Sequence, residues 1–284
     1  MVSFPGKGMR SIIAILLIVV SSHTGSWAQP WEIGGWIGGS NYTGDLNTTR
    51  TITYIQPAFG IHARHSWNPH WVLKSFLNYA QISATDVGSP NIFENTRGLD
   101  FVSNIVEVGA QVEFNFTKYF PGNEKYHFSP YTFIGFALFY FSPKGSYPDY
   151  PPQPLDYYST EGQGLPTYPD RKKYSLVQPA IPIGIGIKYG INYRWNFSVE
   201  VGQRKTFFDY LDDVSTTYID RNTLRVERGE LAPKLADKSR SGDGTPHTLG
   251  MDGKQRGNSQ NNDNYMFIGF SLTYTIHSVN CRAF

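Results

Sequence analysis

Alternation of apolar and other side chains along the chain constrains the fold more than any other feature of this sequence. It is clearest in residues 106–116, 180–190, 195–204 and 266–277, where bulky apolar residues occupy every second position. Glycine, small polar or charged residues fill the positions between them. A helix would repeat its apolar positions every three or four residues, so this two-residue period predicts β-strands.

Four further segments alternate less clearly and bring the expected number of strands to about eight. They are residues 31–42, 57–67, 71–83 and 130–141, of which the first is rich in glycine and the last is apolar on both faces. The connections alternate in length. The shorter ones are 68–70, 117–129 and 190–194, and the longer ones are 43–56, 84–98, 142–173 and 207–264. Such alternation is typical of an antiparallel up-and-down barrel.

The first 28 residues have the features of a cleaved signal peptide. Lys7 and Arg10 precede an unbroken apolar run at 12–20, and Ala28 offers a small residue for cleavage. That run is too short to span a membrane, and no later run reaches the necessary 20 or so residues. Residues 29–277 are therefore expected to form a barrel domain, followed by a periplasmic tail at 278–284.

These features predict an all-β protein, an antiparallel up-and-down transmembrane β-barrel of about eight strands in the bacterial outer membrane. Short turns would face the periplasm and long loops the cell exterior. Because lipid cannot satisfy unpaired backbone groups, the sheet must close on itself. The alternative is a soluble secreted barrel or sandwich, whose apolar face would point inward. The bulky, almost uncharged apolar face favours the membrane.

Charged residues on the less apolar faces would then point into the barrel lumen. They are four acids and four bases, namely Glu32, Glu107, Glu113 and Glu200 with Arg64, Lys74, Lys188 and Arg204. Buried charges are tolerated only when paired and hydrogen-bonded, and eight strands enclose just enough room for side chains. We expect an ion-pair network that plugs the lumen. The alternative is that some of these charges lie beyond the membrane and contact water.

No catalytic, cofactor or metal motif stands out. The histidines lack a metal-binding spacing, and no nucleophile elbow or phosphate loop is present. Without the two bases of the leader, 25 Lys and Arg become 23 and balance 23 Asp and Glu. That balance argues against nucleic acid as a partner. We expect a non-enzymatic protein with no cofactor.

The two longest loops allow alternative interpretations. The loop at 142–173 is rich in Pro and Tyr, which suits either a partner surface or an ordered loop packed over the barrel mouth. In the loop at 207–264, Asp209, Asp212, Asp213 and Asp220 could hold calcium, although a charged surface loop is the default. A short helix is expected within 224–238, and the segment 240–264 is expected to be mobile.

Several stretches resemble a known family. They are residues 42–47, 57–60, 103–107, 161–164, 168–172, 204–218 and 256–258. The most distinctive is RKTFFDYLDDVSTTY at 204–218. Together they resemble the PorG-like outer-membrane barrels of the type IX secretion system.

This resemblance implies a component of the machinery for protein secretion, and for gliding motility where that machinery serves it. It implies association with a periplasmic ring of PorK-like and PorN-like proteins, and it supplies no catalytic residues. On topology, candidate partner-binding residues lie in the periplasmic tail and in the connection 117–129, namely Tyr119, Phe120, Lys125 and Tyr126. Outer-membrane lipid is the other expected partner. A generic structural or adhesion barrel and a lipid-modifying enzyme are the alternatives.

Overall fold

The computed structural model describes residues 31–48, 54–121, 123, 125–239 and 249–276. The predicted signal peptide and the predicted tail at 278–284 lie outside these residues. Within these residues the nine strands are β1 (Trp31–Thr43), β2 (Gln56–Ser66), β3 (Trp71–Thr85), β4 (Asp100–Asn115), β5 (Phe128–Tyr147), β6 (Tyr150–Pro154), β7 (Val177–Gly190), β8 (Trp195–Thr206) and β9 (Asn264–Ile276). The helices are α2 (Ile92–Arg97), α3 (Leu155–Tyr158), α4 (Arg221–Arg228) and α5 (Ala232–Ala236).

Eight of the strands close into an antiparallel barrel. Their order is β4-β3-β2-β1-β9-β8-β7-β5, and pairing of β4 with β5 closes the sheet. The predicted fold class and strand number are therefore confirmed. The remaining strand, β6, is short and forms a hairpin with the end of β5 beyond the barrel wall.

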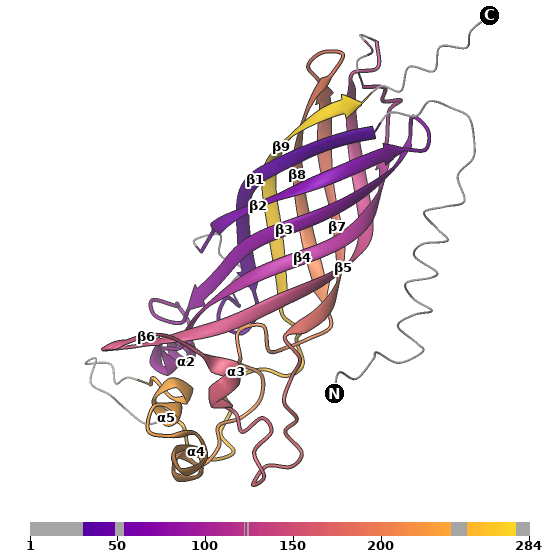
Figure 1. Ribbon diagram of the computed structural model, residues 1–284. Coiled ribbons are helices and arrows are strands. Elements are labelled where there is room, and N and C mark those ends of the chain that lie inside the picture. The colour runs from indigo at the N-terminus through magenta and orange to yellow at the C-terminus, as the bar shows by residue number, and fades with distance from the viewer. Residues whose placement is uncertain (1–30, 49–53, 122, 124, 240–248, 277–284) are drawn as a thin grey trace, which may run out of the picture.

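The two ends of the barrel differ in their connections (Figure 1). One end, here called the turn end, carries the connections 67–70, 116–127 and 191–194, and there Trp31 of β1 lies opposite Ile276 of β9. The other, the loop end, carries the connections 44–55, 86–99, 148–176 and 207–263 and, among the described residues, all four helices. This arrangement is the alternation of short and long connections that the sequence predicts.

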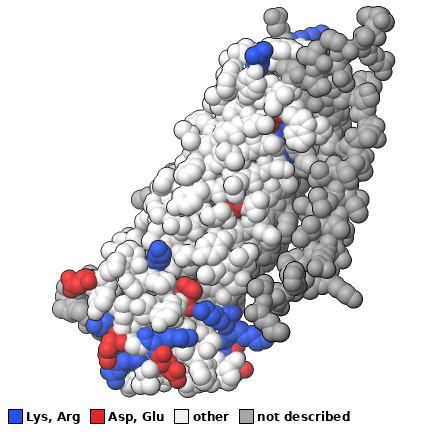
Figure 2. All heavy atoms as spheres, viewed as in Figure 1, with Lys and Arg blue, Asp and Glu red and all other residues white. Residues whose placement is uncertain are grey.

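Bulky apolar side chains cover the outside of the barrel and form what we call the apolar belt. Ile37 is 70% exposed and Ile185 is 65% exposed, whereas the charged residues on the same strands point inward. On the face drawn in Figure 2, charged atoms gather at the loop end and the barrel wall is mostly uncharged. A water-soluble barrel would show the opposite arrangement. Among the described residues, no helix has the length and apolar character needed to cross a membrane.

Near the loop end, the inward-facing positions of the strands carry apolar residues. There Phe101 and Ile105 of β4, with Phe139 and Phe141 of β5, point inward and are almost fully buried. The alternation therefore did not reveal residues 100–105 of β4, which begins at Asp100 and not at the predicted 106, and β5 has two apolar faces. The barrel interior thus changes from charged near the turn end to aromatic near the loop end.

The segment 224–238 contains helical structure, as expected, but in two short helices. The Asp220 side chain caps the N-terminus of α4 by accepting from the Thr223 N–H at 2.7 Å. Gly229, with φ of 89°, ends α4, because a positive φ is readily adopted only without a side chain. α5 begins three residues later, at Ala232, with Pro233 in its first turn, where a missing N–H costs nothing.

Candidate functional site

The structure places the eight predicted lumen charges inside the barrel, on the turn-end side of its aromatic interior. Strand parity puts them there, since each lies at an inward-facing position of β1, β2, β3, β4, β7 or β8. Seven are at most 6% exposed, and the side chain of Glu200 is 17% exposed. We call these eight residues the lumen network.

Four ion pairs join seven of the eight residues. Glu113 receives two cations: its Oε1 lies 3.3 Å from Arg64 Nε and its Oε2 lies 2.5 Å from Lys188 Nζ. The other pairs are Lys74 Nζ with Glu200 Oε2 at 2.7 Å and Arg204 Nε with Glu107 Oε2 at 3.4 Å. Glu32 instead accepts a hydrogen bond from Thr273 Oγ1 at 3.2 Å.

Neutral side chains complete the coordination of the acids. Glu107 accepts from Tyr265 OH at 2.8 Å and from Asn78 Nδ2 at 3.2 Å, and Glu200 accepts from Tyr131 OH at 3.0 Å. Sequence reasoning missed these partners, although inward parity would have indicated all three. A cavity of about 20 Å³ lies between Lys74, Glu200 and their neighbours. That volume suits about one water molecule, so the interior is filled by side chains there.

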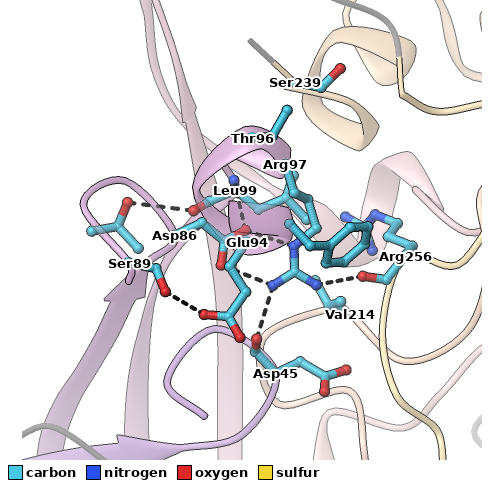
Figure 3. Close-up of polar contacts among 12 residues, drawn as sticks. Asp45, Asp86, Ser89, Glu94, Thr96, Arg97, Leu99, Val214, Ser239 and Arg256 are labelled. Atoms are coloured by element: carbon cyan, nitrogen blue, oxygen red, sulfur yellow. Dashed lines mark hydrogen bonds and ion pairs between the residues drawn. The ribbon is translucent and has the colours of Figure 1, made fainter. Parts of the chain in front are cut away.

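At the loop end, a loop cap covers the aromatic interior; it comprises α2 to α5, β6 and the described parts of the long loops. Two buried arginines join its segments. Arg97 lies in the last turn of α2, which Asn91 caps and Gly98 ends. Arg97 forms a two-pronged pair with Asp86, with Nε–Oδ2 at 2.6 Å and Nη2–Oδ1 at 2.8 Å. It also donates to the carbonyls of Asp45 and Arg256 (Figure 3).

Arg256 is the second arginine and is only 1% exposed. It donates to Glu161 Oε1 at 3.0 Å, to the Asp213 carbonyl at 2.6 Å and to the Ala236 carbonyl at 3.1 Å. These bonds join the loop that contains Glu161 to two separate segments of the loop 207–264 and to α5. The expectation that 240–264 is mobile is therefore wrong for the described residues 249–263, because the buried Arg256 anchors them through three hydrogen bonds. The loop at 142–173 is likewise ordered, with Leu155 buried in the main apolar cluster.

The predicted acidic cluster is mostly buried in the loop cap. Asp213 accepts from Tyr174 OH at 2.6 Å and from the Thr160 hydroxyl, and burial raises its pKa to about 7. Burial likewise raises the pKa of Asp209 to about 7. Asp220 stands apart as the cap of α4. Within the described ranges, no group of three or more His, Cys, Asp or Glu side chains is arranged to hold a metal ion.

Tyr42 lies between two acids of this region. Its hydroxyl is 2.6 Å from Asp212 Oδ2 and 2.7 Å from Asp263 Oδ1. One phenol proton cannot form a full hydrogen bond with two carboxylates, so this contact favours protonation of one of the carboxyl groups. Burial and the nearby negative charges raise the pKa of both carboxyl groups well above its ordinary value, in agreement with such protonation.

The four candidate partner-binding residues lie in the connection 116–127 at the turn end. Phe120 is 41% exposed, Lys125 is exposed and Tyr126 is half-buried. Tyr119 is 3% exposed, and its hydroxyl donates to Asn196 Oδ1 at 2.9 Å. Tyr119 therefore faces the lumen, and its buried ring leaves almost no surface for a partner. Its backbone N–H donates to the Pro69 carbonyl at 3.2 Å.

The pairing and burial define a small, closed β-barrel with an apolar exterior and a filled, capped interior. The chain belongs to the family described as a domain of unknown function, DUF6089, whose model matches residues 9–232. A search of curated proteins finds no match.

Several solved barrels are similar to the chain at low identity. One is Ail, the attachment invasion locus protein of Yersinia pestis, at 10% identity and TM-score 0.40, covering 88% of this chain and 100% of that one. Neisserial surface protein A is similar at 9% identity and TM-score 0.41, with 87% and 97% covered. The N-terminal barrel domain of OprF from Pseudomonas aeruginosa is similar at 9% identity and TM-score 0.34, with the same coverage.

Proposed function

We propose that this protein is an outer-membrane barrel that anchors a periplasmic ring of the type IX secretion machinery and has no enzymatic activity. The observation that carries the membrane location is the apolar belt around a lumen that contains the charges. Hydrocarbon accepts such an exterior, and water does not. The ring would be of the PorK-like and PorN-like kind that the sequence resemblance implies, and the same machinery would serve gliding motility.

The filled interior supports an anchoring role over a conducting one. Ion pairs near the turn end, aromatic rings near the loop end and the loop cap occupy the path through the barrel. Single-channel recording on the purified protein should therefore show no stable open pore. A long-lived conductance would contradict the proposal.

The turn end is the surface proposed for the ring. The connection 116–127 is fixed to its neighbours, since the Asn115 N–H donates to the His70 carbonyl at 2.7 Å and the Gly190 N–H donates to the His127 carbonyl at 2.7 Å. Phe120 and Tyr126 pack with ring centroids 5.9 Å apart, and Lys125 lies over the Tyr126 ring. Aromatic side chains such as these are enriched at partner-binding surfaces.

Co-purification tests this assignment. The tagged protein, extracted in mild detergent, should retain ring lipoproteins, and Phe120→Asp with Tyr126→Asp should release them. Val226→Asp is the matched control, because Val226 is 82% exposed on α4 at the opposite end. Equal ring recovery from all three proteins would refute this surface, and no ring recovery from the unmodified protein would refute the secretion role.

Adhesion through the loop cap is the second candidate. Ile92 and Val226 are 83% and 82% exposed on an ordered surface, which would suit contact with another molecule. Ile92→Ser with Val226→Ser should abolish attachment of barrel-bearing liposomes to cells or matrix if adhesion is the role, and should leave ring recovery unchanged.

A further inference from the structure

A groove of about 720 Å³ runs across the outer wall of the barrel. Strand register places it between two neighbouring rows of outward side chains. The first row is Phe197, Leu272, Gly35, Ile61 and Leu77, and the second is Phe270, Ile37, Phe59, Tyr79 and Val106. Gly35 leaves the first row without a side chain at its centre, and this gap opens the groove.

Packing within the protein does not require glycine at position 35. A Cβ added there would meet only the Gly60 carbonyl, at an ordinary 3.5 Å. At Gly34 and Gly38, by contrast, a Cβ would lie 2.4 Å and about 2.0 Å from backbone oxygens of β9. The absence of a side chain at Gly35 therefore serves nothing inside the barrel, and leaves room for something outside it.

The dimensions and position of the groove select its occupant. Outward residues two apart on a strand are about 6.6 Å apart, whereas a helix with its side chains is about 10 Å across. The groove therefore suits a hydrocarbon chain better than a transmembrane helix. The groove begins at Phe197, two residues from the turn end of β8, and extends to Val106 in the middle of β4.

A cation and two aromatic residues lie at the turn end, next to Phe197 of the groove in the chain. Arg194 is exposed in the turn before β8, and its carbonyl accepts from the Thr275 N–H at 2.7 Å, three residues from Leu272. Its neighbours Tyr193 and Trp195 are 60% and 41% exposed. Tyr and Trp favour the level of lipid headgroups, and arginine matches the oxygens of a phosphate.

We infer that the barrel holds one glycerophospholipid of the turn-end leaflet, with an acyl chain in the groove beside Gly35 and the headgroup phosphate at Arg194. This inference rests on the proposed membrane location and not on the secretion role. It distinguishes one retained lipid from the mobile lipids that surround any membrane barrel.

Native mass spectrometry of the full protein, purified in detergent and supplied with palmitoyl-oleoyl phosphatidylglycerol, tests the site. The unmodified protein should retain one lipid, and Gly35→Leu should lower the retained fraction about tenfold, which corresponds to about 1.4 kcal/mol. Ala110→Leu is the matched control, because it adds the same side chain to another strand outside the groove, and it should retain the lipid. Equal retention by Gly35→Leu and the unmodified protein would overturn the groove.

The diacylglycerol with the same acyl chains tests the headgroup. It should be retained less than phosphatidylglycerol by the unmodified protein, and equally with it by Arg194→Gln. A preference for phosphatidylglycerol that survives in Arg194→Gln would overturn the headgroup assignment. Circular dichroism of each variant checks that it has folded. Failure to recover ring proteins in the co-purification above would leave both results unaffected.

Discussion

The lumen network and the loop cap both bury full charges, but they hold them differently. In the lumen, acids and bases face one another from separate strands, as when Glu113 of β4 lies between Arg64 of β2 and Lys188 of β7. In the loop cap, Arg97 and Arg256 each donate to two backbone carbonyls. Arg97 also pairs with Asp86, and Arg256 with Glu161.

This difference separates two uses of a buried charge. The closed sheet fixes the positions of the lumen residues, so the network depends on charge balance. The loops of the cap have no such frame, and the forked shape of the guanidinium holds carbonyls from several loops at once. Changes of charge should therefore act most on the lumen, and changes of shape most on the loop cap.

Glu113→Ala should have the largest effect. It removes the acid shared by Arg64 and Lys188 and leaves two buried cations without it, which should destabilise the barrel by about 3–5 kcal/mol. Urea unfolding in lipid vesicles, followed by tryptophan fluorescence, measures the loss. Glu227→Ala, at an exposed position of α4, is the control and should unfold like the unmodified protein. An unchanged midpoint for Glu113→Ala would show that the network is not balanced as described.

Arg256→Lys tests shape against charge in the loop cap. Lysine keeps the positive charge but cannot reach Glu161, Asp213 and Ala236 together, so local opening should become easier by about 2–3 kcal/mol. Hydrogen exchange in 209–216 and 249–263 should rise, while barrel strands remain protected. Equal exchange in both proteins, or faster exchange in the strands, would break the proposed separation of the two regions.

Asp213→Asn tests whether a buried acid with a raised pKa makes the loop cap sensitive to pH. Because burial raises the pKa of Asp213 to about 7, its contribution is fully present below the ordinary value and is lost as the pH rises through about 7. The segment 209–216 should exchange hydrogen faster near pH 8 than near pH 5, after correction for intrinsic rates. Asparagine tolerates the φ of 66° at this position and should weaken that dependence. The same dependence in both proteins would rule out Asp213 as its source.

Glu230→Ala should have the smallest effect. Its carboxylate lies 3.8 Å from Arg225, and the two side chains are 78% and 49% exposed. Exposed pairs contribute less than about 1 kcal/mol, so proteolysis of the loop cap should proceed at an almost unchanged rate. Marked acceleration would mean that burial is not what distinguishes the two regions from the surface.

The sequence predicts the barrel well where one face of a strand meets the apolar belt. The segment predicted at 195–204 becomes β8 at Trp195–Thr206, and the inward positions of the lumen charges follow from the same parity. The prediction failed at 100–105, because the strand there passes beyond the belt and its apolar residues turn inward. A single alternation rule cannot detect that change of surroundings.

The loop cap could not be predicted in the same way. Arg256 lies in a Gly- and Asn-rich stretch, and its partners Glu161 and Asp213 are far away in sequence and lie in loops without a period. The resemblance includes 161–164 and 256–258 but assigns them no role. Tyr119 was misplaced for a similar reason, because a short connection gives no parity from which to infer an inward direction.

The central claim is that hydrocarbon surrounds the apolar belt, and site-directed spin labelling tests it most directly. With Cys281→Ser as background, labels at Ile185→Cys in the belt and Val226→Cys on α4 compare two positions that are 65% and 82% exposed. In proteoliposomes, collision with oxygen should dominate at position 185, and collision with a water-soluble nickel complex should dominate at position 226. Ready access of the nickel complex to position 185 would contradict the account.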